Sequence, residues 1–205
     1  MLETVKRWIH RYFTTKKPFT IITDMLFAVL VILLLIPATR KDVSAFFIRI
    51  VSFPPSELNA QEQYPLSPQV ASWPIEALNG YSMPFGSLEG KPIVVNFWAT
   101  WCPPCRAELP GLHDLYEAYK GKVHFAFLSD EPAAVIKKFI QDNQYQDMPF
   151  FRYQSVPQDF ATRSIPATFI ISPDGKVVLE KKGAARWDSG KVKSILDGLI
   201  KSQKQ

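Results

Sequence analysis

The 205-residue sequence predicts an α/β domain, with a mixed sheet and flanking helices, preceded by an apolar segment near the N-terminus. Three observations predict this arrangement. Short, nearly continuous apolar runs are typical of strands buried on both faces. Segments with apolar residues at helical spacing alternate with these runs, which indicates helices that cover a sheet. One much longer apolar run has about the length of a membrane span.

The long apolar run covers residues 19–37 and carries a single charge, Asp24. Its length is close to the ~20 residues that cross a bilayer. Basic residues dominate the segment before it, which predicts a cytoplasmic N-terminus. A cleaved signal peptide usually has a shorter basic segment and small residues at an A-x-A-like site, which residues 36–40 match poorly, and a buried helix would have a polar face. We therefore expect a cytoplasmic basic segment at 1–18 and a transmembrane signal anchor at 19–37.

Residues 38–69 are predicted to be a juxtamembrane segment and a linker. In 42–53, apolar residues share one helical face, which suits the membrane surface or packing on the domain equally well. From 54 to about 68 the chain is rich in proline and polar residues, as in an extended linker. The folded domain is then expected at 70–205.

Each element of this domain is predicted from its own pattern. The strands are short apolar runs, and the helices repeat apolar residues at helical spacing until a stop such as Gly121. The turn signal at 173–176 predicts a hairpin between the last two strands. The predicted order is a strand at 92–98, a helix from the cysteines to about 120, a strand at 123–128, a helix at 132–143, strands at 167–171 and 177–179, and a helix at 192–200.

The net charge of +5 is modest, and the N-terminal segment contributes much of the excess. No basic stripe interleaved with aromatic residues occurs in the rest of the sequence, so nucleic-acid binding is not expected. We also expect no cofactor.

The only two cysteines of the chain, Cys102 and Cys105, lie in the segment WATWCPPC at 98–105. Two intervening residues on the first turn of a helix bring the two sulfurs within bonding reach. A disulfide across so small a ring stabilises a fold little. A metal site would need a second CxxC or a pair of histidines at suitable spacing. A redox couple is therefore favoured over a metal site and over an inert pair.

The position of each residue predicts its role. Cys102 precedes the helix and is expected to be exposed at the positive helix end, as the attacking nucleophile. Cys105 is expected to be more buried and to resolve the mixed disulfide. Pro103 and Pro104 remove two N–H donors near Cys102. Glu108 would oppose thiolate formation from the same side of the helix, or be an ordinary solvated glutamate.

The segment 90–110 resembles the TlpA/ResA-like branch of the thioredoxin fold, and so do the order of elements and the Ile-Pro before 167–171. The resemblance covers roughly residues 75–201. It implies a thioredoxin-like mixed sheet with flanking helices and one N-terminal transmembrane helix. It also implies a thiol-disulfide oxidoreductase that is tethered to the bacterial inner membrane as a single-pass protein, with its domain in the extracytoplasmic space.

The same resemblance implies roles for particular residues. Trp101 would shield the cysteines and contact partners, plain packing being the alternative. Ile165 and Pro166 would face the cysteines through a cis peptide bond and pair with a partner segment, a simple turn being the alternative. Glu108 would take part in proton transfer. Asn96 stands where thioredoxins carry a buried aspartate, so proton handling is expected from Glu108, water or the partner.

The expected reaction is the reduction of protein disulfides, for example in cytochrome c maturation or copper-site assembly. Electrons would come from a membrane donor of the CcdA/DsbD type. Net oxidation of substrate thiols is one alternative, and a tethered binding module or holdase with incidental cysteines is another. The residues expected to contact the protein partner are Trp101, Pro103, Pro104, Ile165 and Pro166; Cys102, Cys105 and Glu108 are the expected catalytic residues, and no metal ligand is expected.

Overall fold

The computed structural model describes residues 17–35 and 52–203. The chain divides into two compact units, Met1–Val43 and Ser44–Gln205. Most of the predicted cytoplasmic segment and most of the predicted membrane-surface segment 42–53 lie outside the described residues.

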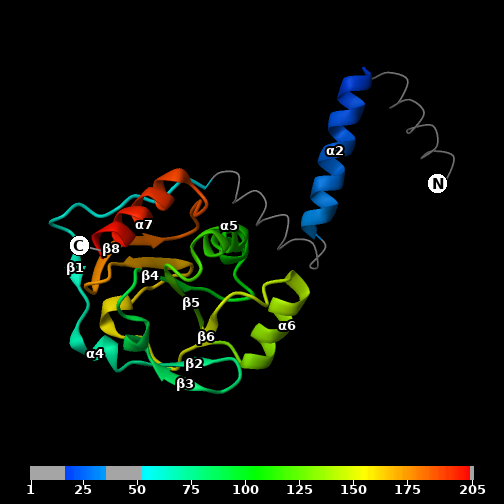
Figure 1. Ribbon diagram of the computed structural model, residues 1–205. Coiled ribbons are helices and arrows are strands. Elements are labelled where there is room, and N and C mark those ends of the chain that lie inside the picture. The colour runs from blue at the N-terminus through cyan, green and yellow to red at the C-terminus, as the bar shows by residue number, and fades with distance from the viewer. Residues whose placement is uncertain (1–16, 36–51, 204–205) are drawn as a thin grey trace. The chain divides into compact units, whose positions relative to one another are not determined.

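The first unit contains helix α2, Pro18–Leu35 (Figure 1). Pro18 opens this helix, at a position where an N–H would lack an intrahelical partner in any case. Large apolar side chains along it are exposed, among them Phe19, Leu26 and Phe27. Within the described ranges, no helix combines the length and the apolar character that a membrane crossing requires.

The second unit is built on one eight-stranded sheet with the strand order β1-β8-β7-β4-β5-β6-β2-β3 (Figure 1). The central strands β4, β5 and β6 are parallel, β7 runs antiparallel to β4, and β8 runs antiparallel to β7, so the expected mixed sheet is confirmed. Every residue of β4 and of β7 is buried, as their continuous apolar sequences predict. The strands are β1 (Tyr64–Pro65), β2 (Pro74–Ala77), β3 (Ser82–Pro84), β4 (Ile93–Phe97), β5 (His124–Ser129), β6 (Phe150–Arg152), β7 (Ala167–Ile171) and β8 (Lys176–Lys182).

Two hydrophobic cores lie on the two faces of this sheet. Helices α5 (Pro103–Tyr119), α6 (Ala133–Asn143) and α7 (Gly190–Ser202) contribute to the first core, which also contains Val94 and Ile170. Helix α4 (Pro68–Ala71) and the 3-10 turns η1 (Phe85–Leu88) and η2 (Gln158–Phe160) contribute to the second core, which contains Phe97 and Phe169. Because neighbouring residues of a strand point to opposite faces, β4 and β7 supply both cores.

The structure adds short strands that the sequence analysis did not predict: β1, the β2–β3 hairpin and β6. Strand β1 lies within the segment expected to be an extended linker, and it pairs with β8. The backbone N–H of Leu58 also donates to the carbonyl oxygen of Val178, at 2.8 Å. Side chains such as Leu66 pack on the second core. Strands of two to four residues are too short to show a periodic pattern, so around β1 the sequence showed only the composition of a linker.

The register of the central strands positions the site. Asn96 on β4 faces Thr168 on β7, and Phe97 faces Ala167. The chain leaves β4 toward the cysteines at the end of the strand where β7 enters from Pro166. The cysteine loop and the Ile-Pro segment, which lie about 60 residues apart in the sequence, therefore meet at one edge of the sheet.

Candidate active site

Cys102 and Cys105 form a disulfide at the start of α5, with their Cα atoms 5.3 Å apart. Cys102 is the N-cap residue of the helix, and its sulfur accepts a hydrogen bond from the backbone N–H of Cys105 at 3.2 Å. Pro103 and Pro104 occupy the first helical positions and have no N–H to offer. Cys105 therefore supplies the backbone donor that the first turn can direct at this sulfur.

Both cysteine side chains are buried, Cys102 being 2% exposed and Cys105 0% exposed. The expectation that Cys102 is exposed is wrong for this oxidised form, because the residue packs in the same core as Trp98 and Ala99. Trp101, directly before Cys102, is 58% exposed. A large apolar surface is thus exposed beside an otherwise enclosed pair.

The segment before β7 borders the cysteines. The peptide bond between Ile165 and Pro166 is cis, and the carbonyl oxygen of Ile165 lies 3.9 Å from the Cys102 sulfur. Ile165 is half-buried, and Pro166 is buried. The structure therefore brings Ile165 and Pro166 to the cysteines, while their role in partner contact stays a prediction.

Glu108 lies one helical turn beyond Cys105 and is 4% exposed, so it is not a solvated surface glutamate. Its Oε1 accepts a hydrogen bond from Nδ2 of Asn96 at 2.8 Å. Its Oε2 accepts one from Nε1 of Trp187 at 2.9 Å and one from the backbone N–H of Ala185 at 3.2 Å. All three partners are donors, which suits a carboxylate.

Burial nevertheless raises the pKa of Glu108 to about 7, because desolvation disfavours the charged form. The hydrogen bonds from Trp187, Asn96 and Ala185 lower the pKa, as does the positive charge of Lys181, but they offset the effect of burial only in part. A carboxyl group that titrates near neutral pH can accept and release a proton under ordinary conditions.

Asn96 connects Glu108 to the neighbouring strand. Besides its bond to Glu108, Nδ2 of Asn96 donates to Oγ1 of Thr168 at 2.8 Å. The side chain of Asn96 is fully buried, and its Oδ1 has no hydrogen-bond partner in the described part of the chain. If the side-chain amide of Asn96 rotates by 180°, this oxygen can accept the O–H of a protonated Glu108. The Thr168 hydroxyl can accept from the amide nitrogen in one orientation and donate to the amide oxygen in the other. Asn96 can thus satisfy both protonation states.

Glu131 holds the loop that carries Trp101. Its carboxylate accepts hydrogen bonds from the backbone N–H and the hydroxyl of Thr100, at 2.6 and 2.7 Å. Nε of Arg152 on β6 donates to the backbone oxygen of Glu131, and Arg152 also pairs with Glu76 on β2 at 3.1 Å. The loop is therefore tied to the short strands β6 and β2, which the sequence analysis did not predict.

One group in the described ranges has the spacing of metal ligands: His113, Glu117 and Asp147, whose ligand atoms lie within 4.8 Å of one another. His113 already bonds to Asp147 at 3.1 Å, and Glu117 forms an ion pair with Lys120 at 2.7 Å. These groups are already paired with one another or with Lys120, so we assign them no ion.

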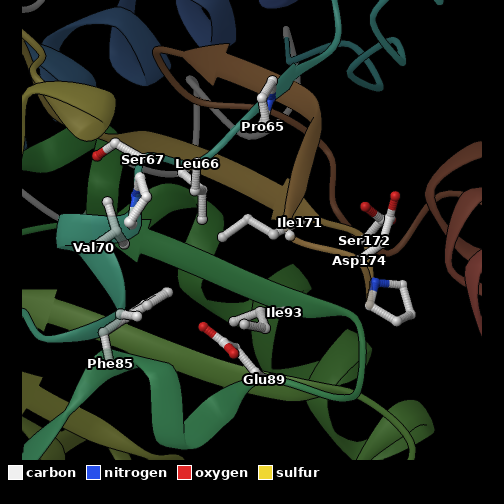
Figure 2. Close-up of a pocket in the computed structure, with 14 residues that line it drawn as sticks. Pro65, Leu66, Ser67, Val70, Phe85, Glu89, Ile93, Ile171, Ser172 and Asp174 are labelled. Atoms are coloured by element: carbon white, nitrogen blue, oxygen red, sulfur yellow. The ribbon is translucent and has the colours of Figure 1, made fainter.

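A pocket of about 290 Å³ lies at the other end of β4 (Figure 2). Its lining includes Val70, Ile93 and Ile171, with the carboxyl group of Glu89 among them. Ile93 begins β4, whereas Cys102 follows the far end of that strand. No predicted site residue lines this pocket, so it is separate from the redox site.

Comparison with known families decides the identity of this arrangement. The model of the AhpC/TSA family matches residues 69–180, which contain the cysteines, Glu108 and the cis proline. The chain belongs to the AhpC/TSA family. The expected thioredoxin-type relationship is thereby confirmed.

Relatives define the branch of the AhpC/TSA family. The thiol-disulfide oxidoreductase ResA of Bacillus thuringiensis (strain Al Hakam) is 30% identical over 146 residues, which cover 69% of this chain and 80% of the relative. ResA of Oceanobacillus iheyensis is 34% identical over 116 residues, 55% of this chain and 60% of the relative. A thioredoxin-family thiol:disulfide interchange protein of Chlorobium tepidum TLS has the same fold, with a TM-score of 0.51 at 23% identity over 66% of this chain and 99% of that one. The chain is therefore a thiol-disulfide oxidoreductase of the ResA type.

In this member of the AhpC/TSA family, sequence reasoning missed the residues that complete the surroundings of Glu108. Trp187 and Ala185 lie 79 and 77 residues beyond Glu108, in the segment between β8 and α7. Thr168 belongs to a strand that was predicted only as an apolar run. No local spacing links these residues to the cysteines, so the sequence carried no signal for them.

We expect the substitution Trp187→Phe to raise the pKa of Glu108. The indole N–H stabilises the carboxylate, and a hydrogen bond to a charged group contributes about 1.5 kcal/mol or more, so its loss should weaken ionisation roughly tenfold. Carboxyl ¹³C NMR against pH measures this change. Trp98→Phe is the matched control, since Trp98 is buried and its Nε1 has no partner among the described residues. Equal effects of the two substitutions would contradict the role of Trp187.

Proposed function

We propose that the protein is a membrane-tethered reductant of disulfides in other proteins. The observation that carries this proposal is the cysteine pair at the N-terminus of α5, which lies against the Ile165 carbonyl with the buried carboxyl group of Glu108 one turn further along. This arrangement supplies a nucleophile, a resolving thiol, a surface for the partner backbone and a group that handles protons.

The reaction runs in two exchanges. The Cys102 thiolate attacks one sulfur of the partner disulfide, a mixed disulfide forms, and the other partner sulfur leaves as a thiolate. Cys105 then gives its proton to the Glu108 carboxylate and attacks the Cys102 sulfur. The disulfide of Cys102 and Cys105 forms, the second partner sulfur leaves, and two electrons have passed to the partner. A membrane dithiol donor of the CcdA/DsbD type returns the pair to its reduced state.

Two features of the site favour reduction over oxidation. Pro103 and Pro104 offer no N–H to a Cys102 thiolate. Glu108, when ionised, places a negative charge within one turn of the cysteines and opposes a second one. A reduced state that is stabilised less has a lower reduction potential, so electrons flow from the protein to its partner.

The surface beside the cysteines suits an extended polypeptide. The ring of Trp101 is exposed, and the segment with Ile165 reaches the Cys102 sulfur. Pro103 and Pro104 are half-buried at the edge of this surface. The targets that we propose are proteins whose cysteines must be reduced outside the cytosol, as in cytochrome c maturation or copper-site assembly.

The proposed tether rests on the sequence and on α2. The apolar run 19–37 overlaps α2, whose exposed side chains Phe19, Leu26 and Phe27 are apolar. The basic residues before the run favour a cytoplasmic N-terminus. We infer a single-pass protein of the bacterial inner membrane with its redox domain on the extracytoplasmic side.

Trapping of the mixed disulfide tests the function. Cys105→Ser removes the resolving thiol, so this variant should hold its partner through Cys102, and the complex should appear in the membrane fraction without reductant. Cys102→Ser is the matched control, because it keeps one cysteine but lacks the nucleophile. Mass spectrometry of the captured protein identifies the substrate. Equal trapping by both variants would contradict the assigned roles.

Two further measurements separate the alternatives. Equilibration with glutathione buffers gives the reduction potential, and a value near that of a strong oxidant (about −120 mV) would indicate net oxidation instead. A double variant, Cys102→Ser with Cys105→Ser, should be inactive in cells. Full activity of that variant would indicate a binding module.

A further inference from the structure

A very small pocket lies directly beside the buried carboxyl group of Glu108. Its volume is about 10 Å³, close to the space that one water molecule needs. Besides Glu108, its lining comes from α5, from the segment between β8 and α7, and from a residue shortly before the proline-rich linker: Ser52, Ala107, Gly111, Ala185, Arg186, Trp187 and Asp188.

The two oxygens of Glu108 have different surroundings. Oε1 is bonded to Asn96, which is fully buried within the sheet. Oε2 is bonded to Trp187 and Ala185, and both of these residues also line the small pocket. The carboxyl group therefore joins the interior of the sheet to a space at the protein surface.

Small residues on α5 keep this space open. Ala107 and Gly111 lie one helical turn apart, and both line the pocket. A Cβ atom at Gly111 would lie 3.6 Å from the backbone nitrogen and from Oδ1 of Asp188, and 3.7 Å from the backbone nitrogen of Trp187. These are ordinary contact distances, so a methyl group fits there but takes the volume that a water molecule would use.

Residues 52 and 53, directly before the proline-rich linker, contribute to the remaining wall. Ser52 lines the pocket, and the backbone N–H of Arg186 donates to the carbonyl oxygen of Phe53 at 3.2 Å. None of the lining residues belongs to the partner-contact surface proposed for Trp101, Pro103, Pro104, Ile165 and Pro166. The pocket thus stays available when a partner covers the cysteines.

We propose that this pocket is the proton port of Glu108, through which a single water molecule exchanges the carboxyl proton with solvent. The inference rests on the proposed function, in which Glu108 takes the proton of Cys105. The proton then leaves from Glu108 to water in the port, and no electron moves in this step. Trp187 is the positioning residue that holds Oε2 of Glu108 at the port.

Charged groups around the port act on the same proton. Arg186 and Asp188 line it from the segment between β8 and α7, and Lys181 of β8 favours the ionised form of Glu108. The cysteines on α5, once reduced, add two titratable groups within two helical turns before Glu108. Substitutions that leave all of these charges in place therefore test the port itself.

Gly111→Ala is such a substitution. It fills the port and removes no charge, and alanine in place of glycine inside a helix also stabilises the fold. Gly198→Ala on α7 is the matched control, because a Cβ atom there meets nothing within 4 Å. Rapid mixing of the full-length oxidised protein into D₂O, followed by infrared spectroscopy of the Glu108 carboxyl band, measures the exchange. The band is assigned by its loss in Glu108→Gln.

We expect exchange in Gly111→Ala to be several-fold slower than in the wild type, and exchange in Gly198→Ala to be unchanged. Proton exchange at the wild-type rate in a folded Gly111→Ala protein would contradict the proposal that this pocket is the proton port. Failure of the proposed function gives a different result, since the wild-type pair would then not cycle in glutathione buffers, whatever the exchange rate. The reduction potential of Gly111→Ala should equal that of the wild type, because the port affects the rate of proton exchange and not the relative stability of the oxidised and reduced forms.

Discussion

Glu108→Gln should gain about 3 kcal/mol of stability relative to the wild type between pH 4 and pH 8. The pKa of Glu108 is about 7 in the folded protein and 4.5 as its ordinary value. Because the folded pKa is the higher one, the folded state binds the proton more tightly. The stabilisation from this proton is complete below pH 4.5 and is lost as the pH rises through 7. The glutamine side chain does not ionise in this range, so the stability of the variant does not decline in this way as the pH rises.

Urea unfolding of the oxidised wild type and variant from pH 4 to pH 9 measures the difference. All other titratable groups are common to both proteins, so subtracting the two curves isolates Glu108. Glu117→Gln, on the exposed side of the same helix, is the control and should keep the wild-type decline. Parallel curves for wild type and Glu108→Gln would show that the buried carboxyl group does not titrate near neutral pH.

A glutamine side chain at position 108 can form hydrogen bonds with the same neighbours. The donors Trp187 and Ala185 both bond to Oε2, so one amide oxygen can serve them together. The amide nitrogen would then replace Oε1 and face Asn96. Since Oδ1 of Asn96 has no partner in the described structure, turning over the Asn96 amide provides an acceptor. The pH dependence of the stability of Glu108→Gln can therefore be measured without a large loss of stability from buried polar groups that lack a hydrogen-bond partner.

The substitution Phe160→Ala should destabilise the fold by about 3–5 kcal/mol. Phe160 is fully buried on η2, and its ring packs against four aromatic rings at centroid distances of 5.1–5.8 Å. Alanine would leave a cavity that these rigid rings cannot close. Such a loss is a large part of the roughly 5–15 kcal/mol that stabilises a typical domain. The four neighbouring rings belong to Trp73, Phe85, Phe97 and Phe169.

Urea unfolding at pH 7 tests this prediction. Val156→Ala, four residues earlier and 37% exposed, is the control and should cost much less. The η2 segment leads directly to Ile165 and Pro166, so the variant should also react more slowly with a partner disulfide. If Phe160→Ala lowered the free energy of unfolding as little as the control does, η2 would not be anchored by this aromatic cluster.

Much of the fold was predictable because its information is local. The strands β4 and β7 are short apolar runs, and the helices α5, α6 and α7 show their periods within their own residues. The bounds of β7 are as predicted, and the predicted ends of the other elements differ from the observed ones by at most two residues, since helix and strand ends depend on neighbouring segments. The short strands β1, β2, β3 and β6 were missed because two to four residues carry no period.

The sequence by itself determined the redox pair, its place at a helix start and the family, because two cysteines separated by two residues carry their chemistry in adjacent positions. Only the tertiary structure decided that Cys102 is buried and that the carboxyl group of Glu108 is enclosed by Asn96 and Trp187. The physical reason is desolvation. Whether a carboxyl group keeps its ordinary pKa depends on which distant segments exclude water from it, and nothing in its own helix turn specifies them.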